Sequence, residues 1–159
     1  MTPSPNFAAL AFQPFRGDDP LLAALGEVRM ARSDEGLVLR LDCGPRARNP
    51  GGVIHGGTFA TLFDVAFYEA TRTGTEPPAV TSALELKFLR PGRPELPLHV
   101  EVRVLQAGRS TVFLVGSAWQ EGRQIAFASG QFTRIAMRAA TGPALSTPDR
   151  GTLHDRPDH

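Results

Sequence analysis

The sequence predicts a single α+β domain in which a curved antiparallel sheet wraps around one central helix. Two observations support this fold class. Residues 59–72 carry apolar side chains at helical spacing, and the apolar stripe is too broad for a helix that lies on a surface. Other segments alternate β-prone apolar residues with polar ones and are separated by short turns. The length of 159 residues suits one domain with irregular ends.

The chain divides into three parts. Residues 1–24 predict an N-terminal arm that ends in a short helix, because four prolines interrupt it and Asp19-Pro20 caps the run LLAAL. Residues 25–136 form the domain itself. Residues 137–159 are rich in Pro, Gly, Asp and Thr, which predicts a disordered tail. Four apolar residues of the arm are expected to attach it to a surface groove: Phe7, Leu10, Phe12 and Phe15.

The strands are predicted from alternation with a period of two residues, and the last four are expected to form an antiparallel meander joined by short turns. Residues 107–110 and 120–123 are typical turn sequences. The predicted strands cover residues 37–42, 80–89, 98–104, 111–119 and 124–135.

The central helix is predicted over residues 56–72. Its buried face is made by residues that coincide on a helical wheel. These are Phe59, Leu62, Phe63, Ala66 and Ala70, widened by Ala60 and Phe67 and extended by Val65.

Composition and charge exclude several classes of protein. Seventeen basic and sixteen acidic residues, with no basic block, argue against nucleic-acid binding. No apolar stretch reaches the roughly 20 residues that cross a membrane, so no membrane contact is predicted. The single cysteine, Cys43, excludes an internal disulfide, and residues 1–15 carry no export signal, so we expect a cytoplasmic protein.

Three common kinds of catalytic or binding motif are missing from the sequence. Histidines and cysteines do not occur at metal-ligand spacing, and neither a phosphate-binding loop with Lys-Ser/Thr nor Gly-x-Ser-x-Gly is present. Cys43 lies beside Asp42 with nothing to lower its pKa, so it is interpreted as structural. We therefore predict no metal and no cofactor.

Gly56-Gly57 at the start of the central helix has two interpretations. One is a tight turn that needs glycine. The other is an oxyanion site, because the first amides of a helix lack internal partners and lie at its positive end. His55, just before them, is more typical of a hydrogen-bonded structural residue than of a base.

Asp64 is the candidate carboxylate of the helix. It lies at the edge of the apolar stripe, where it is either a solvated side chain or, if covered, a general base or nucleophile. Glu69 is a rival, but its position near the helix end predicts an exposed role.

The loop and the helix together carry Asn49, His55-Gly56-Gly57 and Asp64, the last within the run ATLFD. With this pattern the sequence resembles the PaaI-like acyl-CoA thioesterases of the 4-hydroxybenzoyl-CoA thioesterase superfamily, which have the hotdog fold. The resemblance continues through VTSALELKFLRPG, Gly108-Arg109-Ser110 and IAFASGQFTRI, and it covers about residues 25–136.

The resemblance implies a role for each matching residue. Asp64 would activate water or attack the thioester carbon, and the Gly56 N–H would polarise the carbonyl. Asn49 would place the water or the thioester, His55 would hold the loop, and Thr81 would orient the water, although threonine stands where relatives carry another small hydroxyl residue.

The resemblance also implies the substrate and the assembly. The substrate would be a small aromatic or short-to-medium-chain acyl-CoA, which supplies CoA as part of the substrate. Arg90, Arg93 and Arg109 are either CoA-binding residues or ordinary surface cations. The site would lie across a dimer interface, within a dimer of dimers. Two alternatives stay open: a non-catalytic acyl-CoA-binding protein and a hotdog hydratase or dehydratase.

Overall fold

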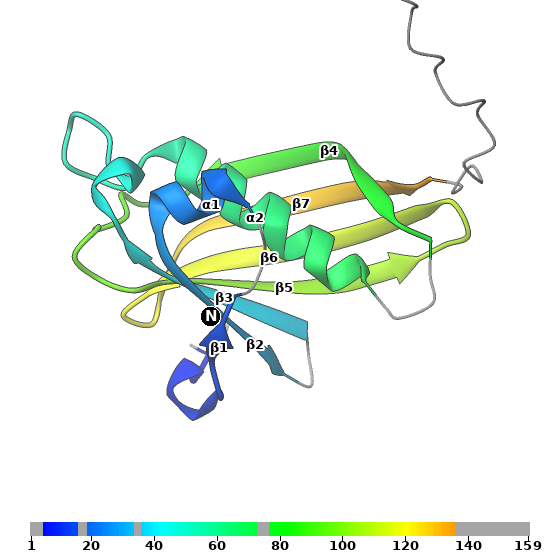
Figure 1. Ribbon diagram of the computed structural model, residues 1–159, viewed down its shortest axis with the longest axis horizontal. Coiled ribbons are helices and arrows are strands. Elements are labelled where there is room, and N and C mark those ends of the chain that lie inside the picture. The colour runs from blue at the N-terminus through cyan, green and yellow to red at the C-terminus, as the bar shows by residue number, and fades with distance from the viewer. Residues whose placement is uncertain (1–4, 16–18, 34–35, 73–76, 136–159) are drawn as a thin grey trace, which may run out of the picture.

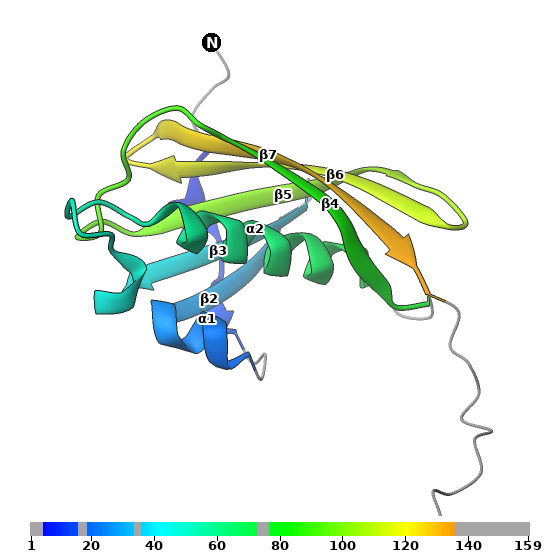
Figure 2. The ribbon, with the colours of Figure 1, turned by 90° about the horizontal axis from the view of Figure 1, so that it is seen from above.

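The computed structural model describes residues 5–15, 19–33, 36–72 and 77–135. One long helix, α2 (Gly56–Thr71), packs against one face of a seven-stranded antiparallel sheet (Figure 1). Viewed from above, the sheet curves around α2 (Figure 2). The predicted fold class is confirmed. The tail predicted at residues 137–159 lies outside the described residues. The strands are β1 (Gln13–Pro14), β2 (Gly26–Ser33), β3 (Gly36–Cys43), β4 (Ala79–Phe88), β5 (Leu98–Ala107), β6 (Thr111–Gln120) and β7 (Arg123–Arg134).

The strand order is β1-β2-β3-β5-β6-β7-β4, which corrects the predicted four-strand meander. Strands β5, β6 and β7 form the meander, whereas β4 pairs with β7 and lies at the edge of the sheet. The connection from β4 to β5 spans residues 89–97 and contains three prolines, so it does not close a tight hairpin. Instead, it crosses the end of the sheet, where the Leu89 and Arg90 amides donate to the Ile125 carbonyl.

The predicted apolar face of α2 is buried against the sheet. Phe63 and Phe67 have no exposed surface. Two glycines make room for these rings, because a Cβ on Gly116 would lie 3.0 Å from Phe63 and one on Gly130 would lie 2.6 Å from Phe67. The helix is therefore fixed closely against β6 and β7, which sets the direction of the residues on its opposite side.

The N-terminal region shows what the sequence did and did not predict. The short helix α1 (Pro20–Leu25) is capped by the Asp19 side chain, as predicted, but β2 was not predicted. In the arm, the ring of Phe7, the first residue of the 3-10 turn η1 (Phe7–Ala9), stacks on His99 with a centroid distance of 4.6 Å. Since Leu98 and Val100 point into the core, His99 and the arm lie on the opposite face of the sheet.

The β6–β7 hairpin is tighter than predicted. Its turn residues, Glu121 and Gly122, have φ values of 46° and 71°, which is typical of a type I′ turn. Gln120, predicted as part of the turn, is the last residue of β6 and only 5% exposed.

Candidate functional site

The loop before α2 is held by its own hydrogen bonds. The Asn49 N–H donates to the Val53 carbonyl at 2.9 Å, and the Asn49 Oδ1 accepts from the Val53 N–H at 3.2 Å. Further on, the Ala47 carbonyl, at the end of the 3-10 turn η2 (Pro45–Ala47), accepts from both the His55 N–H and the buried Thr58 hydroxyl. These contacts fix the loop at both ends and thereby fix the first turn of α2.

The start of α2 leaves one amide without an acceptor. His55 is the N-cap: its Nδ1 accepts from the Gly57 N–H at 2.8 Å, and its carbonyl accepts from the Thr58 N–H at 2.9 Å. Among the residues that the structure describes, none accepts a hydrogen bond from the Gly56 N–H, and Gly56 is exposed. A free amide at the positive end of a helix is a ready donor for an anion or a polarised carbonyl.

An apolar cleft of about 430 Å³ lies beside this amide. Phe88, the last residue of β4, is 56% exposed and packs edge-on against Phe59 with a centroid distance of 5.7 Å. A Cβ built on Gly56 would lie 3.4 Å from the Phe88 ring, so the aromatic side chain lines the approach to the amide. The cleft residues are Val53, Ile54, Gly56, Phe59, Phe88, Leu89, Arg90, Pro91 and Gly92.

Asp64 lies on α2 two turns beyond Gly56 and is half-buried. Its Oδ1 accepts a hydrogen bond of 2.5 Å from the hydroxyl of Thr81, which is exposed on β4. Asp64 is eight positions after Gly56 on the helix, a rise of about 12 Å. A single chain therefore does not bring the Gly56 amide and the Asp64 carboxylate together on the same small group.

Glu69, the rival carboxylate, was predicted to be exposed, and this is wrong. Its side chain is only 12% exposed and forms an ion pair of 3.1 Å with Arg72 at the end of α2. The ion pair with Arg72 neutralises its charge. Its carboxylate is thus engaged in closing the helix.

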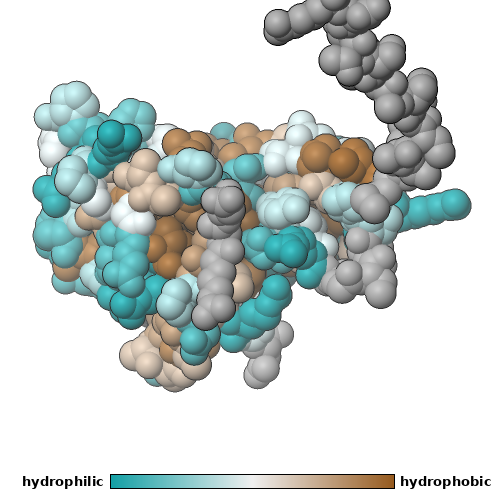
Figure 3. Space-filling model, in the orientation of Figure 1, coloured by the Kyte–Doolittle hydropathy of each residue, from teal (hydrophilic) through white to brown (hydrophobic). Residues whose placement is uncertain are grey.

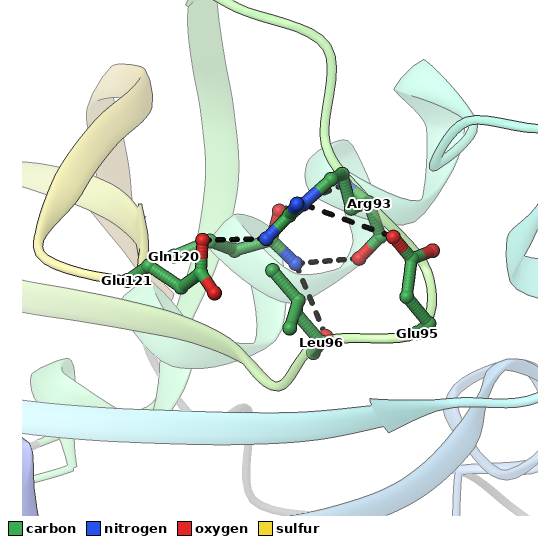
Figure 4. A network of polar contacts seen from close by, with 5 residues as sticks. All are labelled: Arg93, Glu95, Leu96, Gln120 and Glu121. Atoms are coloured by element: carbon green, nitrogen blue, oxygen red, sulfur yellow. Dashed lines mark hydrogen bonds and ion pairs between the residues drawn. The ribbon is translucent and has the colours of Figure 1, made fainter.

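The three candidate CoA-binding arginines do not lie together in one chain. Arg90 donates to the Gln124 carbonyl at 2.7 Å, and Arg93 pairs with Glu121 at 2.5 Å (Figure 4). Arg109 lies in the turn between β5 and β6, at the other end of β5. Ten strand residues separate the two ends, which is about 33 Å.

Three residues near the site were not predicted from the sequence: Thr58, Phe88 and Gln120. Thr58 occupies an ordinary helix position, and only its burial shows that its hydroxyl ties the helix to Ala47. Phe88 was assigned to the sheet, and its contact with Gly56 depends on the edge position of β4. No local sequence signal marks Gln120, because its partners are backbone atoms about 25 residues away.

The described residues also bear on metal binding, on the thiol and on membrane spanning. Within the described ranges, no cluster of three His, Cys, Asp or Glu side chains is arranged to hold a metal ion. Burial raises the pKa of the Cys43 thiol to about 11, in agreement with a structural role. None of the helices in the described part of the chain is long and apolar enough to cross a bilayer.

The chain forms a curved antiparallel sheet around one long helix, and the candidate residues lie on that helix and on an edge strand. A sheet curved around one helix in this way defines the hotdog class of proteins. Comparison with known proteins then gives the family. A family model described as the thioesterase superfamily matches residues 51–127. A Pseudomonas aeruginosa protein named as an esterase is 36% identical over 125 residues, which is 76% of this chain and 92% of that protein. The chain belongs to the thioesterase superfamily.

Solved structures agree with this assignment. The Escherichia coli PaaI protein from the phenylacetic acid degradation operon is 28% identical with a TM-score of 0.67, covering 75% of this chain and 86% of that one. The BH2602 protein of Bacillus halodurans, solved with CoA, is 26% identical with a TM-score of 0.68, covering 78% of this chain and 83% of that one. The predicted PaaI-like hotdog fold is confirmed.

Proposed function

We propose that this protein hydrolyses the thioester of an acyl-CoA, with a small aromatic or short-to-medium acyl group, to the free acid and CoA. The observation that carries the proposal is the exposed Gly56 N–H, which has no acceptor among the described residues and borders an apolar cleft. A thioester carbonyl seated there would gain a donor for the oxyanion that forms in the transition state. Membership of the thioesterase superfamily and the esterase name of a relative support hydrolysis.

A second copy of the chain would complete the site. β4 is one of the two edge strands, and it carries exposed Val80 and Phe88. Hydrophobic surface lies along the upper border of the molecule, where β4 runs in Figure 1 (Figure 3). Antiparallel pairing of β4 with a copy, about its midpoint, would bring the end of β4 that carries Thr81, with Asp64 beside it, next to the end of the other subunit's β4 that carries Phe88, with Gly56 beside it. Within one chain, the Gly56 amide and the Asp64 carboxylate lie about 12 Å apart along the helix. In the dimer, the Gly56 amide of one subunit and the Asp64 carboxylate of the other would face the same thioester.

The chemistry follows from these two groups. Asp64 acts either as the base that removes a proton from water or as the nucleophile itself. In the first route, the water oxygen attacks the carbonyl carbon while the carbonyl oxygen becomes an oxyanion on the Gly56 N–H. Collapse of that intermediate breaks the C–S bond, and the CoA thiolate leaves and takes up a proton. The Thr81 hydroxyl, bonded to Asp64, fixes the carboxylate.

The remaining predicted residues support the site. His55 orders the first turn of α2 through the Gly57 amide, and Asn49 closes the loop on Val53. Among the arginines, Arg90 borders the cleft and is the best candidate for a CoA phosphate, in keeping with the CoA found in the Bacillus halodurans structure. In the proposed pairing of β4 strands, the partner contributes its Arg109 turn to the same end.

A thiol-release assay across aromatic and aliphatic acyl-CoAs tests the proposal. Asp64→Asn retains an acceptor for Thr81 but loses the charge, so we expect kcat to fall by about 100-fold or more. Glu27→Gln, which removes an exposed carboxylate on β2, is the matched control and should leave kcat unchanged. If acyl-CoA raises the melting temperature of the wild-type protein but its thioester stays intact, the protein binds acyl-CoA without hydrolysing it, and the proposal is wrong.

A further inference from the structure

The buried side chain of Gln120 makes three hydrogen bonds to one loop. Its Oε1 accepts from the Arg93 N–H at 2.8 Å, and its Nε2 donates to the carbonyls of Arg93 at 2.7 Å and Leu96 at 3.1 Å (Figure 4). The loop connects β4 to β5, and its prolines supply no amide donors of their own. An amide side chain that satisfies three backbone groups of such a loop determines its position.

The same loop touches the peptide that leads into α2. Gly92, directly before Arg93, accepts a hydrogen bond of 2.9 Å from the Ile54 N–H. The contact is tight, since a Cβ on Gly92 would lie 3.0 Å from both Ile54 and Phe59. Ile54 precedes the N-cap His55, which precedes Gly56. A continuous chain of contacts therefore runs from Gln120 through the loop to the amide that faces the cleft.

We propose that Gln120 is a positioning residue for the oxyanion donor: through Arg93, Gly92 and Ile54 it fixes the direction of the Gly56 N–H. This inference rests on the proposed hydrolysis. Arg90 is anchored separately, by its backbone bond to the Ile125 carbonyl and its side-chain bond to the Gln124 carbonyl. Loss of Gln120 should therefore disturb the amide more than the candidate CoA contact, and should lower kcat more than it raises KM.

The test replaces Gln120 by Met, which has a similar shape but makes none of the three hydrogen bonds. Gln124→Met is the matched control, because Gln124 lies on the same hairpin and its side-chain amide donates to the Ser117 hydroxyl rather than to the loop. Gln120→Asn, whose side chain keeps the amide but is one methylene shorter, is the second variant if Gln120→Met does not fold. We expect kcat to fall about 10- to 100-fold in a Gln120 variant with KM within about threefold of wild type, as for a displaced catalytic group.

Hydrogen exchange provides a readout that needs no substrate. In the Gln120 variant, the Ile54 amide should exchange at least about tenfold faster than in Gln124→Met, because the Gly92 acceptor is no longer held. Unchanged exchange at Ile54, or a loss of stability with unchanged kcat in the folded protein, would overturn the positioning role. A wild-type protein that hydrolyses no acyl-CoA would instead overturn the proposed function, whatever the exchange result.

Discussion

Replacing Gly56 by proline should remove the proposed oxyanion donor without breaking the helix. Proline is tolerated at the first helical position, and the Gly56 N–H has no acceptor in the described structure that would be lost. The preceding residue, His55, has φ −64° and ψ 140°, which suits a residue before proline. A Cβ at this position meets the Phe88 ring at 3.4 Å, an ordinary contact. The melting temperature should therefore shift by less than about 4 °C.

The effect on catalysis should be much larger. Loss of one oxyanion donor costs about 100- to 1000-fold in kcat, or about 2.7–4 kcal/mol of transition-state stabilisation. The assay is CoA release followed with a thiol reagent, and Gly56→Ala is the control because it adds the Cβ and retains the N–H. Equal kcat values for Gly56→Pro and Gly56→Ala, with both proteins folded, would refute the role of this amide.

Three further predictions follow from named contacts. Thr81→Val should lower kcat by about 10- to 100-fold, because it removes one hydrogen bond to a charged group, whereas Thr81→Ser should retain activity. Equal kcat values for the two variants in steady-state assays would contradict this prediction. Because burial raises the Cys43 pKa to about 11, the rate of its alkylation by iodoacetamide should still rise about tenfold per pH unit above pH 9, as measured by mass spectrometry. A rate that reaches a plateau near pH 9 would be inconsistent with this burial. Gly130→Ala places a Cβ 2.6 Å from Phe67 and should destabilise the protein by about 1–3 kcal/mol in urea unfolding, with Gly56→Ala as the control; an unchanged midpoint would show that the helix is free to shift.

The helix and most strands were predictable because their patterns are local. The apolar stripe of α2 and the alternation in β5 report burial directly, and both elements begin at the predicted residues. Strand order is different, since alternation says which face a strand buries but not which neighbour it pairs with. The edge position of β4 depends on the connection at residues 89–97 and on hydrogen bonds to β7. β2 was missed because Val28 and Met30 alternate with charged residues over a short stretch only, and Ala31 and Arg32 then reverse the alternation.

The candidate site residues come from short motifs, and their roles stay predictions. The resemblance selected Gly56, Asp64 and Thr81 separately, and the structure shows that the Thr81 hydroxyl donates to Asp64 from another element. For the arginines, the sequence was misleading about distance. Arg109 was grouped with Arg90 because both lie in or beside turns, but the length of β5 separates them within a chain. Gln120 shows a third case, in which a residue acts on a loop that is distant in sequence.

We propose that each site draws its amide from one subunit and its carboxylate from another. Gly56→Pro and Asp64→Asn chains carrying different tags can be co-expressed and the mixed dimer isolated by two affinity steps. In that dimer one site carries both defects and the other carries neither, so we predict about half the activity of the wild-type dimer, although each parent is nearly inactive. Activity no higher than that of the parents would contradict a shared site.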